Sequence, residues 1–214
     1  AGTAGQKDLV VAIDVSDDTP GSTSDPHARV AAAVAAALAL LDTLSFRDYV
    51  AVVPFTTFAD RSVTPALVQA TAAQVALLKA QVAALRVVAG SRSRVEAGVA
   101  GALAAFDDPQ SGTSGCTKML ALLSGGVDTA TGGVDTARAA AATLKKRGDV
   151  IAVAVHTLGR AATAQDTLAP VGLRRIACGS RGLSRVADGG STAAAAALAV
   201  NDYLARVKET NTVR

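Results

Sequence analysis

The chain has 214 residues, of which 50% are hydrophobic, so its length and composition suit a single domain with a sizeable core. Its net charge is only +3, with acidic and basic residues interspersed, which argues against a nucleic-acid partner. No apolar run approaches the ~20 residues of a membrane helix, and we expect no direct membrane insertion by this segment. Two cysteines, Cys116 and Cys178, are too few for a disulfide scaffold or a zinc site; they form one bridge or stay as two buried thiols.

The first apolar segment, residues 9–15, predicts a buried strand that ends in oxygen-bearing side chains. Asp14 and Ser16 stand together at its end, and Asp18 follows two positions later. Open α/β folds place their sites at the carboxyl ends of buried parallel strands. This stretch therefore predicts a site of oxygen ligands at one edge of a sheet.

Strand and helix patterns alternate along the rest of the chain. Asp25 followed by Pro26 predicts a helix start, because proline suits the first helical turn. The expected strands cover residues 49–55, 118–123, 150–156 and 182–186, with a short edge partner at residues 57–63. The expected helices cover residues 26–44, 75–85, 95–106, 136–147, 165–176 and 192–207.

Strands separated by helices of this length require right-handed parallel crossovers with helices on both faces. The predicted fold is a doubly wound α/β domain, with a mostly parallel central sheet and one short antiparallel edge strand. We expect a flexible lead-in at residues 1–6, one domain at residues 7–208 and a tail at residues 209–214.

Several motifs resemble those of von Willebrand factor A domains, and most of all the A domains of voltage-gated calcium channel alpha-2-delta subunits. The Asp14-to-Asp18 stretch is similar to the first metal-site loop of the family, usually Asp-x-Ser-x-Ser. The other similar segments, in the same order and spacing, are residues 41–44, 48–55, 69–71, 77–79, 116–126, 173–178 and 182. The resemblance covers nearly the whole chain and implies the same doubly wound fold.

The resemblance also implies a metal-ion-dependent adhesion site that holds Mg²⁺ or Ca²⁺. Asp14 and Ser16 match the first two ligands, whereas Asp18 stands in place of the second serine. Ser93 lies where the second loop normally supplies threonine. One or two carboxylates with further oxygens are a usual set for Mg²⁺.

The third loop departs from the family pattern of Thr-Asp-Gly. It reads Ser124-Gly125-Gly126, so Gly125 replaces the usual aspartate. Ser124 and Gly125, with Arg92 and Arg94, are expected to form the partner-binding rim. An arginine there could also bond Asp14 and make a cation unnecessary, in which case the site is vestigial.

As a function, the resemblance implies a non-enzymatic protein-interaction or adhesion module within a larger extracellular or cell-surface protein. A carboxylate of the partner would complete the metal coordination; the partner is a channel, a matrix component or another copy of the chain. One alternative is a structural scaffold in a surface assembly or filament. The other is a Mg²⁺-dependent phosphoryl-transfer enzyme that uses Asp14 and Asp18, although the sequence has no recognisable phosphate loop.

Overall fold

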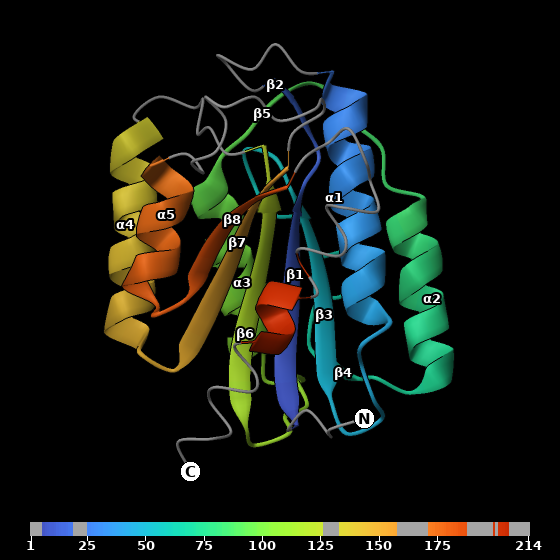
Figure 1. Ribbon diagram of the computed structural model, residues 1–214. Coiled ribbons are helices and arrows are strands. Elements are labelled where there is room, and N and C mark those ends of the chain that lie inside the picture. Colours follow the sequence, from blue (N-terminus) through green and yellow to red (C-terminus); the bar gives the residue numbers. More distant parts are fainter. Residues whose placement is uncertain are drawn as a thin grey trace.

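The computed structural model describes residues 6–18, 25–125, 133–157, 171–187, 199 and 201–205. A six-stranded sheet of order β4-β3-β1-β6-β7-β8 forms its centre (Figure 1). The strands are β1 (Lys7–Asp14), β3 (Tyr49–Phe55), β4 (Val68–Gln69), β6 (Thr117–Ser124), β7 (Val150–Thr157) and β8 (Leu183–Ala187). All neighbouring pairs are parallel except β3 with β4. The predicted doubly wound α/β fold with one antiparallel edge strand is confirmed.

Helices cover both faces of this sheet. The described helices are α1 (Pro26–Leu41), α2 (Ala72–Ala83), α3 (Val95–Asp107), α4 (Gly133–Arg147) and α5 (Val171–Gly179), with a further helical stretch at residues 201–205. The first core cluster joins α1, α2 and Tyr203 to one face, and the second joins α3, α4 and α5 to the other. Both layers are visible on either side of the sheet (Figure 1).

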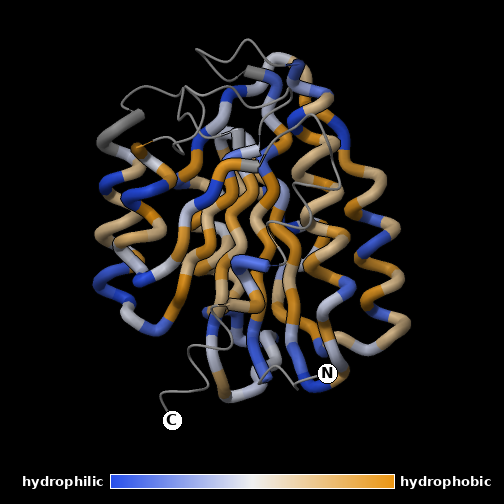
Figure 2. The backbone as a smooth tube through the Cα atoms, viewed as in Figure 1, coloured by the Kyte–Doolittle hydropathy of each residue, from blue (hydrophilic) through white to orange (hydrophobic). Residues whose placement is uncertain are grey.

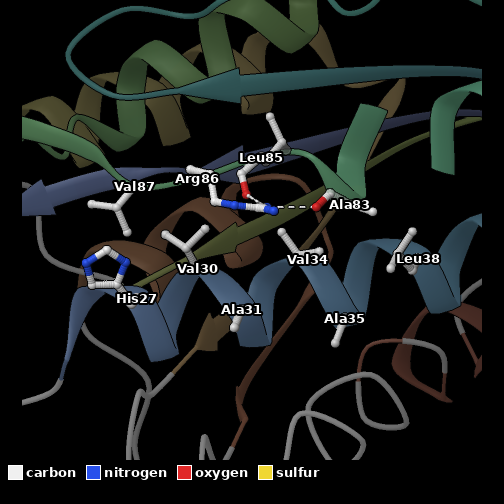
Figure 3. Close-up of a pocket in the computed structure, with 10 residues that line it drawn as sticks. All are labelled: His27, Val30, Ala31, Val34, Ala35, Leu38, Ala83, Leu85, Arg86 and Val87. Carbon is white, nitrogen blue, oxygen red and sulfur yellow. Dashed lines mark hydrogen bonds between the residues drawn. The ribbon is translucent and has the colours of Figure 1, made fainter. Parts of the chain in front are cut away.

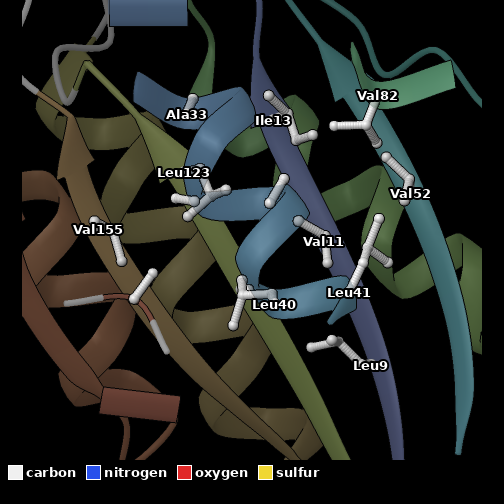
Figure 4. Close-up of a cluster of buried hydrophobic side chains, with 14 of the residues drawn as sticks. Leu9, Val11, Ile13, Ala33, Leu40, Leu41, Val52, Val82, Leu123 and Val155 are labelled. Carbon is white, nitrogen blue, oxygen red and sulfur yellow. The ribbon is translucent and has the colours of Figure 1, made fainter. Parts of the chain in front are cut away.

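Strand β1 feeds both cores, because successive side chains of a strand point to opposite faces. Leu9, Val11 and Ile13 belong to the cluster beneath α1, whereas Val10 and Ala12 belong to the opposite cluster. Figure 4 shows the first set packed against the helix, and Figure 2 shows the apolar strands at the centre of the molecule. A strand buried on both faces reads as a continuous apolar run, which is why the sequence revealed it.

The beginning of α1 is where the sequence predicted it. Pro26 is the first helical residue, and the Asp25 carboxylate accepts a hydrogen bond from the backbone N–H of His27 at 2.9 Å. This side-chain cap satisfies one of the backbone donors that lack a partner in the first turn. The helix ends at Leu41, three residues before the predicted end at residue 44.

The prediction of an edge strand at residues 57–63 is wrong. Only a single bridge forms there, between Phe55 and Ala59, and the antiparallel edge strand is β4 instead. The Thr64 hydroxyl accepts a hydrogen bond from the Val52 N–H at 2.5 Å and donates to the Val52 carbonyl at 3.0 Å. The Thr64 side chain thereby bonds the backbone N–H and carbonyl of Val52, which a neighbouring strand would otherwise pair.

A second, two-stranded parallel sheet was not predicted. It pairs β2 (Ser16–Asp18) with β5 (Val88–Arg92) directly beyond the end of β1. The Val88 N–H donates to the Val15 carbonyl at 2.9 Å, which ties β5 to the end of the first strand. Both strands are short and rich in polar residues or glycine, so they lack the apolar pattern that marks a strand in sequence.

Cys116 and Cys178 are free thiols, so the bridge considered from the sequence is not formed. Cys178 is exposed in the last turn of α5, and Cys116 is half-buried in the turn before β6. Neither is a fully buried thiol, so the second interpretation of the two cysteines was also wrong. The reason is their position. Cys178 lies on α5, which covers one face of the sheet, and Cys116 lies in the turn before the amino end of the central strand β6.

The later part of the chain agrees with the predicted elements where it is described. Helix α5 overlaps the helix expected at residues 165–176, of which residues 165–170 lie outside the described residues. Within the helix expected at residues 192–207, residues 199 and 201–205 are helical. None of the helices in the described part of the chain is both long and apolar enough to cross a membrane.

Candidate functional site

The carboxylate of Asp14 lies at the carboxyl end of β1 and is the centre of a buried cluster of hydroxyl groups. Its Oδ1 accepts hydrogen bonds from the Ser16 hydroxyl at 2.6 Å and the Ser16 N–H at 3.1 Å. Its Oδ2 accepts from the Ser93 hydroxyl at 2.6 Å and the Ser124 hydroxyl at 2.7 Å. The side chains of these four residues form what we call the Asp14 cluster; Asp14 itself is only 5% exposed.

Three separate segments bring the hydroxyls to Asp14. Ser16 begins β2, Ser93 lies between β5 and α3, and Ser124 ends β6. Strands β1 and β6 are parallel neighbours with Ile13 opposite Leu123, so Asp14 and Ser124 leave the sheet side by side. The expected approach of Asp14, Ser16 and Ser93 is therefore present in the fold.

The resemblance predicts Ser124 in the partner-binding rim, whereas the structure has its hydroxyl in the cluster. The pairing of β1 with β6 could have located Ser124. Parallel neighbouring strands that end in register bring their last residues to the same edge of the sheet. Gly125 follows it directly and is buried, so no side chain extends from the position where the family pattern has aspartate. Asp18 ends β2 in register with Arg92 of β5.

Neither arginine of the expected rim bonds Asp14. Among the described residues, the hydrogen bonds to this carboxylate come only from the three hydroxyls and the Ser16 N–H. Arg94 is exposed and pairs with Glu96 at 3.1 Å. The hypothesis that an arginine takes the place of a cation at Asp14 is therefore wrong for the described part of the chain.

Arg29 and Asp17 support the cluster without belonging to it, and no sequence pattern singled out Arg29. Arg29 of α1 is buried, and its Nη2 donates to the Asp17 carbonyl at 3.0 Å. The Asp17 Oδ2 accepts the Gly90 N–H at 2.9 Å, which links β2 to β5. These contacts hold β2, which begins at Ser16, against α1 and β5. Asp17 contributes through its backbone carbonyl and its carboxylate.

All the side-chain atoms of the Asp14 cluster that could coordinate a metal are oxygens. The hydroxyls donate their protons to Asp14, so their lone pairs remain available to a cation. Hard cations such as Mg²⁺ and Ca²⁺ prefer such oxygens, whereas zinc sites usually contain histidine or cysteine. No group of three or more histidine, cysteine or acidic residues suited to a metal occurs in the described ranges. The Asp14 cluster thus fits a hard cation, with one carboxylate to balance its charge.

A separate groove runs along α1 and has a different chemistry. It measures about 450 Å³ and is lined mainly by apolar residues such as Val30, Val34 and Leu85 (Figure 3). Among the described residues, its polar lining consists of His27 and Arg86 and includes no carboxylate. This groove therefore does not offer a cation site, and the Asp14 cluster is the candidate.

With this geometry established, comparison with solved structures shows the class of fold: the chain has the fold of von Willebrand factor A domains. A von Willebrand factor type A structure from Catenulispora acidiphila superposes with a TM-score of 0.71 at 24% identity, covering 94% of this chain and 42% of that one. The pilus adhesin SpaC from Lactobacillus rhamnosus GG gives 0.61 at 15% identity, over 95% of this chain and 30% of the adhesin.

A third similar structure carries a metal in its own site. Proximal thread matrix protein 1 from the mussel byssus, described with a zinc-occupied MIDAS motif, gives a TM-score of 0.60 at 13% identity, over 95% of this chain and 46% of that one. The chain thus spans less than half the length of these three structures. No family model and no curated protein sequence matches the chain.

Proposed function

We propose that the chain is a non-enzymatic protein-interaction module whose Asp14 cluster holds a divalent cation at the carboxyl edge of the sheet. The observation that carries the proposal is the convergence of three buried serine hydroxyls on one buried carboxylate. Asp14, Ser16, Ser93 and Ser124 would hold the cation, with Asp18 as a further acidic candidate. A bound cation would supply a positive centre that attracts a carboxylate of the partner.

The descriptions of two similar structures support an interaction role. One is a pilus adhesin and another is a thread matrix protein with an occupied metal motif. On this basis we place the chain outside the cell or at its surface, as one part of a larger protein. A channel, a matrix component or a second copy of the chain would each fit as partner. The closer likeness to alpha-2-delta subunits rests on the sequence motifs alone.

A second candidate function is a structural scaffold with a vestigial metal site. It is favoured by one observation: the Asp14 carboxylate already accepts four hydrogen bonds from the protein. A buried carboxylate with that many donors is stabilised without a cation. Gly125, moreover, supplies no second acidic group. In this case binding would use helices and loops rather than the sheet edge.

An enzymatic role has less support from the cluster. A phosphoryl-transfer site needs groups that position and activate a nucleophile and stabilise charge on the phosphate. Among the described residues, the side chains bonded to Asp14 are serine hydroxyls that all donate to the same carboxylate. We therefore propose no catalytic residue.

Calorimetric titration of Mg²⁺, Ca²⁺ and Mn²⁺ into the metal-stripped chain tests the proposal. We expect saturable binding with a Kd of about 0.1–1 mM, the range of extracellular calcium modules, because the cluster is built around a single carboxylate. Asp14→Ala should abolish the binding, since it removes the carboxylate around which the cluster is built. Ser93→Ala should weaken it about tenfold by deleting one oxygen.

Asp25→Ser is the matched control, because Asp25 is a carboxylate outside the cluster and serine also caps helices. It should leave cation binding unchanged. Absence of saturable binding in the unmodified chain up to about 10 mM cation, ten times the weakest expected Kd, would refute the metal-dependent proposal and favour the scaffold.

Gly125→Asp provides a gain-of-function prediction at the same edge. A second carboxylate next to Ser124 should tighten cation binding by about tenfold or more, because the charge of the ligands sets affinity. Titration of this variant in parallel with the unmodified chain measures the change. A Gly125→Asp variant that folds normally, as judged by circular dichroism, yet binds no tighter would show that this position does not face the site.

A further inference from the structure

Two exposed phenylalanines lie beyond opposite ends of β3. Phe46 is 63% exposed just before the strand, and Phe58 is 75% exposed just after it. Only 3% of the chain is aromatic, so two such side chains on the surface are a large share. Single exposed apolar side chains are normal on a protein surface, so each phenylalanine is judged together with its neighbours.

The strand itself separates the two positions. It has seven residues, and six steps of about 3.3 Å put its ends roughly 20 Å apart. Phe46 therefore belongs to the amino edge of the sheet and Phe58 to the carboxyl edge, where the Asp14 cluster also lies. Surfaces at opposite ends of one axis allow copies to stack end to end.

At the amino edge, Phe46 and Arg47 form a projecting pair, which we call the knob. The Asp48 Oδ2 accepts hydrogen bonds from the Ser45 N–H at 2.7 Å and its hydroxyl at 2.9 Å, which closes the turn. The Gln69 Nε2 donates to the Phe46 carbonyl at 2.8 Å. The Arg47 guanidinium lies 5.6 Å from the centre of the Phe46 ring. The turn thus presents an aromatic ring and a positive charge in one fixed arrangement.

At the carboxyl edge, a hollow of about 430 Å³ opens beside the end of β3. Its walls include Val15, Phe55, Phe58 and Val88, and Asp60 is the acidic residue among the described residues of its lining. Arg86 also lines it, but its Nη1 donates to the carbonyls of Ala83 and Leu85 at the end of α2. The hollow therefore combines apolar walls with an exposed carboxylate and with a guanidinium that is held at the end of α2 by backbone carbonyls.

We propose that copies of this chain associate head to tail, with the knob of one copy seated in the hollow of the next. Phe46 would contact the apolar walls, and Arg47 would pair with Asp60. Within the part of the chain that the structure describes, neither Arg47 nor Asp60 forms an ion pair. The Asp60 Oδ1 accepts the Ser62 N–H at 2.8 Å, and its Oδ2 would be the partner of Arg47. A contact between different surfaces does not close on itself in pairs and extends into open chains.

This inference goes beyond the proposed function, because neither surface contains a residue of the Asp14 cluster. A single aromatic anchor and one rim ion pair give a weak contact, so association should appear only at high concentration. Sedimentation velocity of the 214-residue chain between about 10 μM and 1 mM, a range chosen to bracket weak affinities, should show a growing average mass.

Variants test the two surfaces independently. Phe46→Ser and Phe58→Ser should each weaken association about tenfold, the usual effect of losing an aromatic anchor. Arg47→Asp and Asp60→Arg should each weaken it similarly through like-charge contacts, and the double variant should restore it to within about threefold. Leu77→Ser is the matched control: Leu77 is 53% exposed on α2, away from both surfaces, and its loss should have no effect.

Several results would overturn the inference. A chain that stays monomeric throughout the concentration range has no such contact. An effect of the Phe46 variant without one of Asp60→Arg, or no recovery in the double variant, would show that the knob does not meet the hollow. Loss of association in Leu77→Ser would indicate non-specific apolar contact. Cation titration of Phe46→Ser should match that of the unmodified chain, which separates this test from that of the proposed function.

Discussion

Replacing Asp48 with alanine should lower the free energy of unfolding by about 3–5 kcal/mol. Asp48 and Lys7 form an ion pair at the amino edge of the sheet, where the Lys7 Nζ lies 3.1 Å from the Asp48 Oδ2 and each side chain is only 2% exposed. The same carboxylate accepts the Lys7 N–H and both Ser45 donors. Its loss would leave the buried Lys7 ammonium without a counter-charge and the buried Lys7 N–H without an acceptor, which is costly.

Urea unfolding followed by circular dichroism measures this change. Asp42→Ala is the matched control, because Asp42 pairs with Lys79 at the surface and is 63% exposed; its loss should cost under about 1 kcal/mol. Adding Lys7→Met to Asp48→Ala should recover part of the stability, since the unpaired charge is removed. Equal losses in Asp48→Ala and Asp42→Ala would contradict the buried pair.

The second large effect is expected from Gly182→Ala, which should destabilise the domain by about 3 kcal/mol or more. A Cβ at Gly182 would lie 1.6 Å from the Ala152 carbonyl oxygen and 2.6 Å from its carbonyl carbon. The obstacle is the backbone of β7, which cannot turn aside as a flexible side chain could. Since β8 begins at the next residue and pairs with β7, relief of the clash should displace the edge strand.

Thermal unfolding and hydrogen exchange together test this prediction. At roughly 2–4 °C per kcal/mol for a chain of this size, the Tm should fall by about 6 °C or more. Gly172→Ala in α5 is the comparison: its Cβ would also meet a tight contact, 3.1 Å from the Ala137 Cβ, but with a side-chain methyl and not with strand backbone, and alanine favours helix, so its loss of stability should be smaller. We expect amide protection to fall mainly in β8. A Gly182→Ala variant as stable as Gly172→Ala would mean that the two strands separate easily.

The sequence by itself determined the fold class and part of the candidate site. Leu9 to Ile13 read as a continuous apolar run because β1 is buried on both faces, and this placed Asp14 at the end of a central strand. The motif around Asp14, with Ser16 two residues later, then pointed to an oxygen-lined site. The apolar run and the motif each consist of residues that are close in the sequence, so both can be recognised without knowledge of the fold.

Only the tertiary structure decided the features that depend on contacts between distant segments. Ser124 joins Asp14 across 110 positions because β6 lies beside β1, and the apolar pattern of a strand does not state its neighbours. Lys7 is buried although it is charged, because Asp48, 41 positions away, accepts its backbone N–H and balances its ammonium. Beyond its short pairing with β4, the edge of β3 is bonded at Val52 by the Thr64 hydroxyl and not by a strand. Such outcomes follow from which polar groups meet after folding, since a buried donor or charge is stable only with its partner in place.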